Sequence, residues 1–232
     1  MENVLITGAN RGLGLGLVRL YLQRGERVFA GCRSPEKAKI LHDLQRKNPG
    51  RLTLVGLDVT NESSLETASQ VVGAETSHLD ILYNNAAINL GDETLLTARA
   101  DHLLSTLQVN AVGAVMAAKY FLTLLKASEH PKLVNISSEA GSISRMNKPR
   151  GYAYYSSKAA MNMFTRSLSL DKDLAGCIVI SIHPGWIRTD MGGANATLSP
   201  AESASGIVSV VDRLALADNG KFFTYTGEEY PW

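Results

Sequence analysis

The chain has 232 residues, 45% of them hydrophobic, and its 23 basic and 22 acidic residues leave a formal net charge of +1. This length suits one α/β domain, and the dispersed, balanced charge gives no electrostatic footprint for nucleic acid or an anionic membrane. We therefore expect a single domain, residues 1–232, with neither nucleic acid nor membrane among its partners.

The first residues lead directly into an apolar run, without the basic and hydrophobic segments of a signal peptide, and we expect no later run to approach the length of a membrane span. These features favour a cytoplasmic location. Cys32 and Cys177 lie in strand-like apolar segments, which is typical of reduced core thiols. The 5 histidines lack metal-ligand spacing, so no metal is expected.

Short apolar runs rich in β-branched residues alternate with amphipathic stretches of helical period. The apolar runs predict strands at 4–7, 27–32, 52–59, 79–84, 132–137, 177–183 and 221–225. The amphipathic stretches predict helices at 12–24, 35–47, 61–77, 99–128, 152–174 and 200–217. Apolar strands separated by helices are typical of a parallel sheet covered on both faces, with ligands bound beyond the carboxyl ends of the strands. The predicted fold class is therefore α/β, a single-domain Rossmann fold with a doubly wound, seven-stranded parallel sheet.

The first predicted strand runs into the glycine-rich stretch "TGANRGLG", residues 7–14, which precedes a predicted helix. Gly8, Gly12 and Gly14 lack a Cβ, so the backbone can adopt positive φ and a ligand can come close to it. The amides and the dipole of the following helix then point at an anion. Alone, the stretch indicates a phosphate-binding turn or a packing turn about equally well.

Tyr154 and Lys158 lie four residues apart on one face of a predicted helix. An unperturbed tyrosine, with a pKa of about 10, is a poor acid–base group at neutral pH, and a neighbouring ammonium favours its ionised form. Alone, the pair is also typical of a packed tyrosine beside a solvated lysine. Ser138 ends a predicted strand, and Asn110 lies inside a predicted helix, where asparagine is a mediocre helix former and is often a satisfied core amide.

Seven segments in order resemble the classical short-chain dehydrogenase/reductase family over essentially the whole chain. They are "TGANRGLG" (7–14), "LDVT" (57–60), "NNAA" (84–87), Asn110, "NISSEAG" (135–141), "YYSSK" (154–158) and "HPGWIRTDM" (183–191). One such motif is weak, but seven with sensible spacing are specific. The resemblance implies an oxidoreductase that interconverts a carbonyl and a secondary alcohol by hydride transfer.

The resemblance also implies four catalytic residues. Tyr154 is expected to protonate the carbonyl oxygen during reduction, and Ser138 to orient that oxygen by a hydrogen bond. Lys158 is expected to lower the pKa of Tyr154 and to hydrogen-bond the nicotinamide ribose. Asn110 is expected to position a water that relays protons to Lys158.

For the cofactor, the resemblance implies contacts from every segment except those at Asn110 and 135–141. The glycine turn and the residues around the nicotinamide form most of the expected site. The expected cofactor-binding residues are Gly8, Asn10, Arg11, Gly12, Leu13 and Gly14 in the turn, Asp58 and Val59 at the adenine, Asn85 and Ala86 at the adenosine ribose, Tyr154 and Lys158, and Pro184, Gly185, Ile187 and Thr189 at the nicotinamide.

The end of the second predicted strand favours NADP(H) over NAD(H). An NAD-selective site places a carboxylate there for the ribose 2′-hydroxyl, whereas an NADP site offers a cation to the 2′-phosphate. Cys32 stands where the family has its acid, Arg33 follows, and Arg11 adds a second cation. We expect neither arginine to lie near an acidic residue that repels phosphate. The alternative is that both are ordinary surface charges.

Two departures from the family pattern bear on the substrate. Ala87 replaces the glycine of the family's "NNAG", and "RMNKPRG" (145–151) lengthens the stretch between Ser138 and Tyr154. This insertion and the ending "GKFFTYTGEEYPW" resemble the sniffer and C-factor-like carbonyl reductases of the family. Loops at about 141–151 and 190–199 are expected to wall the pocket of a small-molecule carbonyl or alcohol substrate.

Two other functions remain open at this point. One is a cofactor-binding, C-factor-like signalling protein with little or no turnover. The other is epimerisation or dehydration of a nucleotide sugar, for which the chain is short of an additional substrate domain. The resemblance further implies a homodimer or homotetramer built on the predicted helices 99–128 and 152–174.

Overall fold

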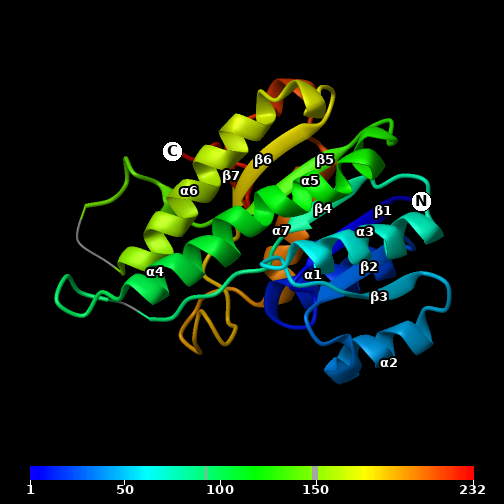
Figure 1. Ribbon diagram of the computed structural model, residues 1–232, viewed down its shortest axis with the longest axis horizontal. Coiled ribbons are helices and arrows are strands. Elements are labelled where there is room, and N and C mark those ends of the chain that lie inside the picture. Colours follow the sequence, from blue (N-terminus) through cyan, green and yellow to red (C-terminus); the bar gives the residue numbers. More distant parts are fainter. Residues whose placement is uncertain (92, 148–150) are drawn as a thin grey trace.

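The fold is described by a computed structural model that covers residues 1–91, 93–147 and 151–232 (Figure 1). Over these residues, parallel strands form one 7-stranded sheet in the order β3-β2-β1-β4-β5-β6-β7. The strands are β1 Asn3–Thr7, β2 Arg27–Cys32, β3 Leu52–Gly56, β4 Ile81–Asn84, β5 Lys132–Ile136, β6 Ile178–His183 and β7 Phe222–Thr224. The predicted seven-stranded, doubly wound parallel sheet is confirmed.

Helices cover both faces of this sheet. They are α1 Gly12–Gln23, α2 Lys39–Lys47, α3 Glu62–Glu75, α4 Ala100–Leu107, α5 Gly113–Lys126, α6 Tyr152–Ser169 and α7 Pro200–Asp212. Helices α1, α2 and α7 pack on one face, and α3, α5 and α6 on the other (Figure 1). In β1, Val4 and Ile6 belong to the first core and Leu5 to the second. Because both faces are buried, the central strands are mostly apolar and do not alternate apolar with polar residues.

The predicted helix 99–128 differs from the structure in one respect that matters for the site. A π-helical turn, Gln108–Val112, separates α4 from α5, and Asn110 lies within it. A π turn carries one extra residue per turn and often occurs at functional sites.

We expected no apolar run to approach the length of a membrane span, and by the criteria of length and composition this expectation is wrong. The stretch Ala100–Lys126 is long and apolar enough to cross a membrane. Its apolarity has a reason within the fold, because Ala117, Phe121 and Leu125 are fully buried against the sheet in the second core.

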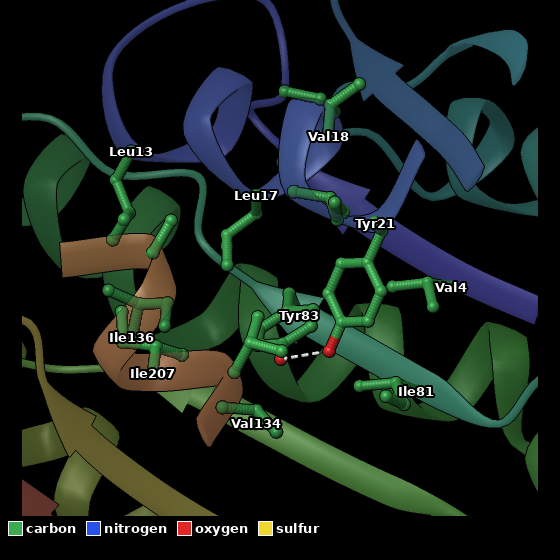
Figure 2. Close-up of a cluster of buried hydrophobic side chains, with 14 of the residues drawn as sticks. Val4, Leu13, Leu17, Val18, Tyr21, Ile81, Tyr83, Val134, Ile136 and Ile207 are labelled. Carbon is green, nitrogen blue, oxygen red and sulfur yellow. Dashed lines mark hydrogen bonds between the residues drawn. The ribbon is translucent and has the colours of Figure 1, made fainter. Parts of the chain in front are cut away.

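Two tyrosine hydroxyls form a hydrogen bond inside the first core. Tyr21 of α1 and Tyr83 of β4 are fully buried, and their hydroxyl oxygens lie 2.7 Å apart (Figure 2). Each hydroxyl therefore supplies the partner that the other needs away from water.

Replacing one member of the pair should destabilise the protein more than the loss of one oxygen atom suggests. Tyr83→Phe leaves the Tyr21 hydroxyl buried without its partner, which costs about 1–3 kcal/mol. In urea unfolding, the double variant Tyr21→Phe/Tyr83→Phe should therefore lose less free energy of unfolding than the two single variants lose in sum. Strictly additive losses would contradict this account.

Candidate active site

A cleft of about 970 Å³ lies at the carboxyl ends of the strands. This volume is at the upper end of the range of about 300–1,000 Å³ that is usual for small-molecule sites. The cleft is lined by most of the site residues predicted from the sequence: Gly8, Asn10, Arg11, Gly12, Leu13, Arg33, Asp58, Val59, Asn85, Ala86, Tyr154, Lys158, Pro184, Ile187 and Thr189. Cys32 and Ala87 line it as well.

Four predicted residues lie behind this lining rather than in it: Gly14, Asn110, Ser138 and Gly185. A Cβ on Gly14 would come within 2.7 Å of Asn85 Nδ2, so this glycine lets α1 pack closely on the turn after β4. Gly185 has a φ of +79°, and a Cβ there would meet the Tyr225 ring at 3.0 Å. Both glycines thus have packing reasons in this structure.

Sequence motifs missed one wall of the cleft. Ser105, Gln108 and Val109 line it from α4 and the π turn, and Ile88 lines it from the loop after β4. Ser105, Gln108 and Val109 have the spacing i, i+3, i+4, which places them on one face of a helix, and this was the signal in the sequence that could have found them. That signal does not say which side of a helix faces a ligand, and these residues match no motif.

The glycine turn is tied to the turn after β4. Thr7 Oγ1 accepts hydrogen bonds from the amides of Asn85 and Ala86, each at 3.0 Å. Asn85 Nδ2 donates to the carbonyl oxygens of Thr7 and Gly8, at 2.9 and 3.2 Å. Gly8 has a φ of +66°, and a Cβ on it would come within 2.9 Å of Ala86 Cα. A side chain at position 8 would therefore collide with the turn after β4.

The amino end of α1 is suited to phosphate. Helix α1 begins at Gly12 without a side-chain cap from Arg11, and the turn before it lines the cleft. The first-turn amides of a helix have no partner within the helix and attract anions. The turn, the uncapped helix and the size of the cleft together fit a dinucleotide cofactor.

Asn110 joins the π turn to two other elements. Its Oδ1 accepts from the Ile88 amide at 2.8 Å, while its Nδ2 donates to the Ile88 carbonyl at 2.8 Å and to Ser157 Oγ at 3.0 Å. The side chain is fully buried, and both of its N–H groups are used. Within the described residues Asn110 makes no hydrogen bond to Lys158, so the water relay stays a prediction.

Tyr154 and Lys158 project from the first two turns of α6. Lys158 Nζ lies 5.8 Å from the centre of the Tyr154 ring and donates to the Ile136 carbonyl at 2.8 Å. The lysine is 2% exposed, and this burial lowers its pKa to about 7.

Burial also raises the pKa of Tyr154 to about 12, and interaction with the Ser138 hydroxyl offsets part of the rise. The direction of the shift is the reverse of the lowering expected from Lys158. The physical reason is that desolvation of the phenolate is the largest contribution, and the group that lowers the pKa in part is the Ser138 hydroxyl rather than Lys158.

The two serines after β5 have different environments. Ser137 is buried, and its hydroxyl donates to Asn162 Oδ1 of α6 at 2.7 Å. Ser138 caps a short turn, Glu139–Gly141, and its Oγ accepts from the Ala140 amide at 3.1 Å. Since this bond uses an acceptor lone pair, the hydroxyl proton of Ser138 is left to donate toward Tyr154 or a substrate oxygen.

One expectation about the two arginines is wrong. Arg11 forms an ion pair with Asp190, at 3.0 Å, because the loop after β6 returns across the glycine turn. The two side chains are 66% and 81% exposed, so the pair contributes at most about 1 kcal/mol. Arg33 lines the cleft and has no ion-pair partner among the residues that the structure describes.

The two predicted substrate loops are described to different extents. Asp190 and Met191 of the loop at 190–199 line the cleft. In the loop at 141–151, residues 148–150 lie outside the described residues. Over the described part of the chain, no group of three or more His, Cys, Asp or Glu residues could hold a metal ion. The expectation of a metal-free site stays a prediction.

The chain belongs to the short-chain dehydrogenase family, because residues 2–198 match it. Among solved structures it is similar to the carbonyl reductase Sniffer of D. melanogaster, with 36% identity and a TM-score of 0.95 over 100% of both chains. It is also similar to an NADPH-bound carbonyl reductase from chicken fatty liver, with 34% identity and a TM-score of 0.95 over 100% of this chain and 99% of the other.

A third relative is the C-signal protein of Myxococcus xanthus, 36% identical over 162 residues, which cover 68% of this chain and 95% of that protein. Together these likenesses identify the chain as an oxidoreductase of the short-chain dehydrogenase type, similar to carbonyl reductases.

The buried Lys158 should make stability depend on pH in a defined window. Between a pKa of about 7 in the folded protein and the ordinary value of 10.5, the unfolded chain binds more protons than the folded one. The free energy of unfolding therefore rises with pH across this window. Measured by urea unfolding between about pH 7 and 10.5, wild type should gain stability relative to Lys158→Met. Lys126→Met, at an exposed lysine, is the control for the loss of one charge. A constant difference would contradict the burial of a titrating lysine.

Proposed function

We propose that the protein is an NADP(H)-dependent reductase that interconverts a carbonyl and a secondary alcohol, with Asn110, Ser138, Tyr154 and Lys158 as its catalytic tetrad. The observation that carries this proposal is that one cleft unites a phosphate-suited glycine turn with the half-buried Tyr154 and the buried Lys158. The likeness to an NADPH-bound carbonyl reductase supports it.

The residues that would hold the cofactor follow the cleft from end to end. The α1 amides and the glycine turn would bind the diphosphate, Asp58 and Val59 the adenine, and Pro184, Ile187 and Thr189, with Gly185 behind them, the nicotinamide. When bound, the nicotinamide supplies the hydride that attacks the carbonyl carbon.

The chain itself supplies the proton and the orientation of the substrate. A Tyr154 with a pKa of about 12 is protonated at neutral pH and can give its phenolic proton to the carbonyl oxygen as negative charge develops there. The free O–H of Ser138 donates a hydrogen bond to the same oxygen. Lys158, charged in part near neutral pH, stabilises the phenolate that proton transfer leaves behind.

For cofactor choice, Arg33 lines the cleft directly after β2 and would face the 2′-phosphate, and Cys32 provides no carboxylate to oppose it. Arg11 can also be recruited, because its exposed pair with Asp190 is weak. These charges support NADP(H) over NAD(H).

The proposed assembly is a homodimer or homotetramer. Leu104 and Val112, on α4 and the π turn, and Met163 on α6 are exposed apolar side chains on helices that pack together. A second copy would cover them. The proposed location is the cytoplasm.

A second candidate function is suggested by the likeness to C-signal. In that case the cleft would bind the cofactor with little or no turnover. Titration with NADPH and NADH, followed by NADPH oxidation across aldehydes, quinones and ketones, separates the two candidates. Tight NADPH binding with turnover supports the reductase, whereas tight binding without turnover supports the signalling protein.

Removing the phenolic hydroxyl should separate chemistry from binding. Tyr154→Phe takes away the proton donor and leaves the cofactor cleft otherwise intact, so turnover should fall by at least about a hundredfold. Fluorescence titration should give an NADPH Kd close to that of wild type. Turnover retained in this variant would remove Tyr154 from the chemistry.

Charge reversal at the end of β2 should change cofactor preference. Arg33→Asp places a carboxylate where a 2′-phosphate would lie, so the ratio of kcat/KM values should move from NADPH toward NADH. Asp190→Asn tests the opposite change. It removes the ion-pair partner of Arg11 and leaves this cation available to the 2′-phosphate, so the ratio should move further toward NADPH. An unchanged ratio in Arg33→Asp would exclude this arginine from the 2′-phosphate site.

A further inference from the structure

We propose that His183 and the segment Tyr230–Trp232, here called the C-terminal strap, are positioning residues that hold the Ser138 turn in its catalytic geometry. This inference rests on the proposed reductase function. Neither His183 nor the strap lines the cleft, so both act through the turn.

His183 binds the amide that directly follows Ser138. It is the last residue of β6, and its Nδ1 accepts a hydrogen bond from the Glu139 amide at 3.1 Å. The next amide, that of Ala140, is bound by Ser138 Oγ. Both amides therefore have a hydrogen-bond acceptor. Because Ser138 Oγ accepts from one of them, its own O–H remains to donate elsewhere. Without the imidazole acceptor, the Glu139 amide would lose its partner and the turn could rotate.

The surroundings of His183 keep its ring in place and able to accept. The ring packs against Tyr230 of the strap, with 5.8 Å between ring centres. Burial lowers the pKa of His183, while the nearby Glu139 carboxylate raises it in part, and the result is a neutral imidazole. A neutral ring that accepts at Nδ1 carries its proton on Nε2.

The strap fixes the other end of the same turn. The Trp232 carbonyl accepts from the Ser144 amide at 3.1 Å, from Ser144 Oγ at 2.7 Å and from Ser142 Oγ at 3.3 Å. The Arg145 guanidinium lies 5.7 Å from the centre of the Tyr230 ring. The end of the described chain thus returns to the segment that follows the Ser138 turn (Figure 1).

The strap is itself held on β7. The Tyr230 amide donates to the Phe222 carbonyl at 2.6 Å, and the Trp232 ring stacks on Phe222 with centres 5.4 Å apart. Phe222 is fully buried in the sheet. Residues 138–145 are therefore held between a rigid strand edge and the imidazole of β6, which is the kind of support that a catalytic hydroxyl needs.

Two substitutions at His183 isolate the hydrogen bond. His183→Asn offers Oδ1 near the position of Nδ1 and keeps the acceptor, whereas His183→Phe keeps ring packing on Tyr230 and removes the acceptor. We expect His183→Phe to lower kcat for NADPH-dependent carbonyl reduction about tenfold or more, because small displacements of a catalytic group have large effects. His183→Asn should recover most of that loss. The NADPH Kd should be unchanged in both variants.

A second measurement does not depend on catalysis. Hydrogen exchange followed by mass spectrometry on peptides covering 138–146 should show faster exchange in His183→Phe and in Tyr230→Ala than in wild type and His183→Asn. If wild type turns over no carbonyl, the reductase proposal fails, and the exchange data alone decide whether His183 and the strap hold the turn.

Three results would overturn the positioning role. One is equal kcat in His183→Phe and wild type. Another is a His183→Asn variant as impaired as His183→Phe, since that would mean that the acceptor atom is unimportant. The third is unchanged exchange of residues 138–146 in both His183→Phe and Tyr230→Ala.

Discussion

The site depends first on the pairing of β1 with β4. At this point of the sheet the strand order reverses, so the segments after β1 and β4 leave toward opposite faces and a crevice opens between them. The crevice keeps its shape because the Thr7 hydroxyl bridges the two strands, accepting from Asn85 and Ala86 and donating to the Tyr83 carbonyl at 3.2 Å. Only glycine at position 8 allows this approach. The cofactor turn and the wall opposite it are therefore one hydrogen-bonded unit.

Burial sets the electrostatics of the other half of the site. Moving a lysine and a tyrosine out of water disfavours the charged form of each, so the pKa of Lys158 falls to about 7 and that of Tyr154 rises to about 12. The free protein thus holds a protonated phenol beside an amine that exchanges its proton near neutral pH. This state suits reduction, in which the phenol must begin with its proton, and it is reached by desolvation rather than by an ion pair.

Much of this could be predicted from the sequence, because the controlling interactions are local. The periodicity of strands and helices predicted the sheet. The glycine turn and the Tyr154–Lys158 pair could be recognised because each involves only residues close together in the sequence. The remainder depends on contacts between distant segments. Asp190 pairs with Arg11 across the folded chain, Asn110 bonds to Ile88 from a π turn that no residue pattern specifies, and His183 meets Glu139 and Tyr230 only in three dimensions. The direction of the Tyr154 shift was missed for the same reason, because burial is a property of the fold.

The contacts of Trp232 also set an order of events during synthesis. Residues 142–145 leave the ribosome well before residues 230–232, which carry the carbonyl and the rings that hold them. At about 5–20 residues per second, several seconds pass between the two. Through that interval the nascent chain can already form β1 to β4 and the cofactor turn, while the segment after β5 still lacks its anchor. The half of the site around Ser138 is thus completed only once the last described residues have emerged.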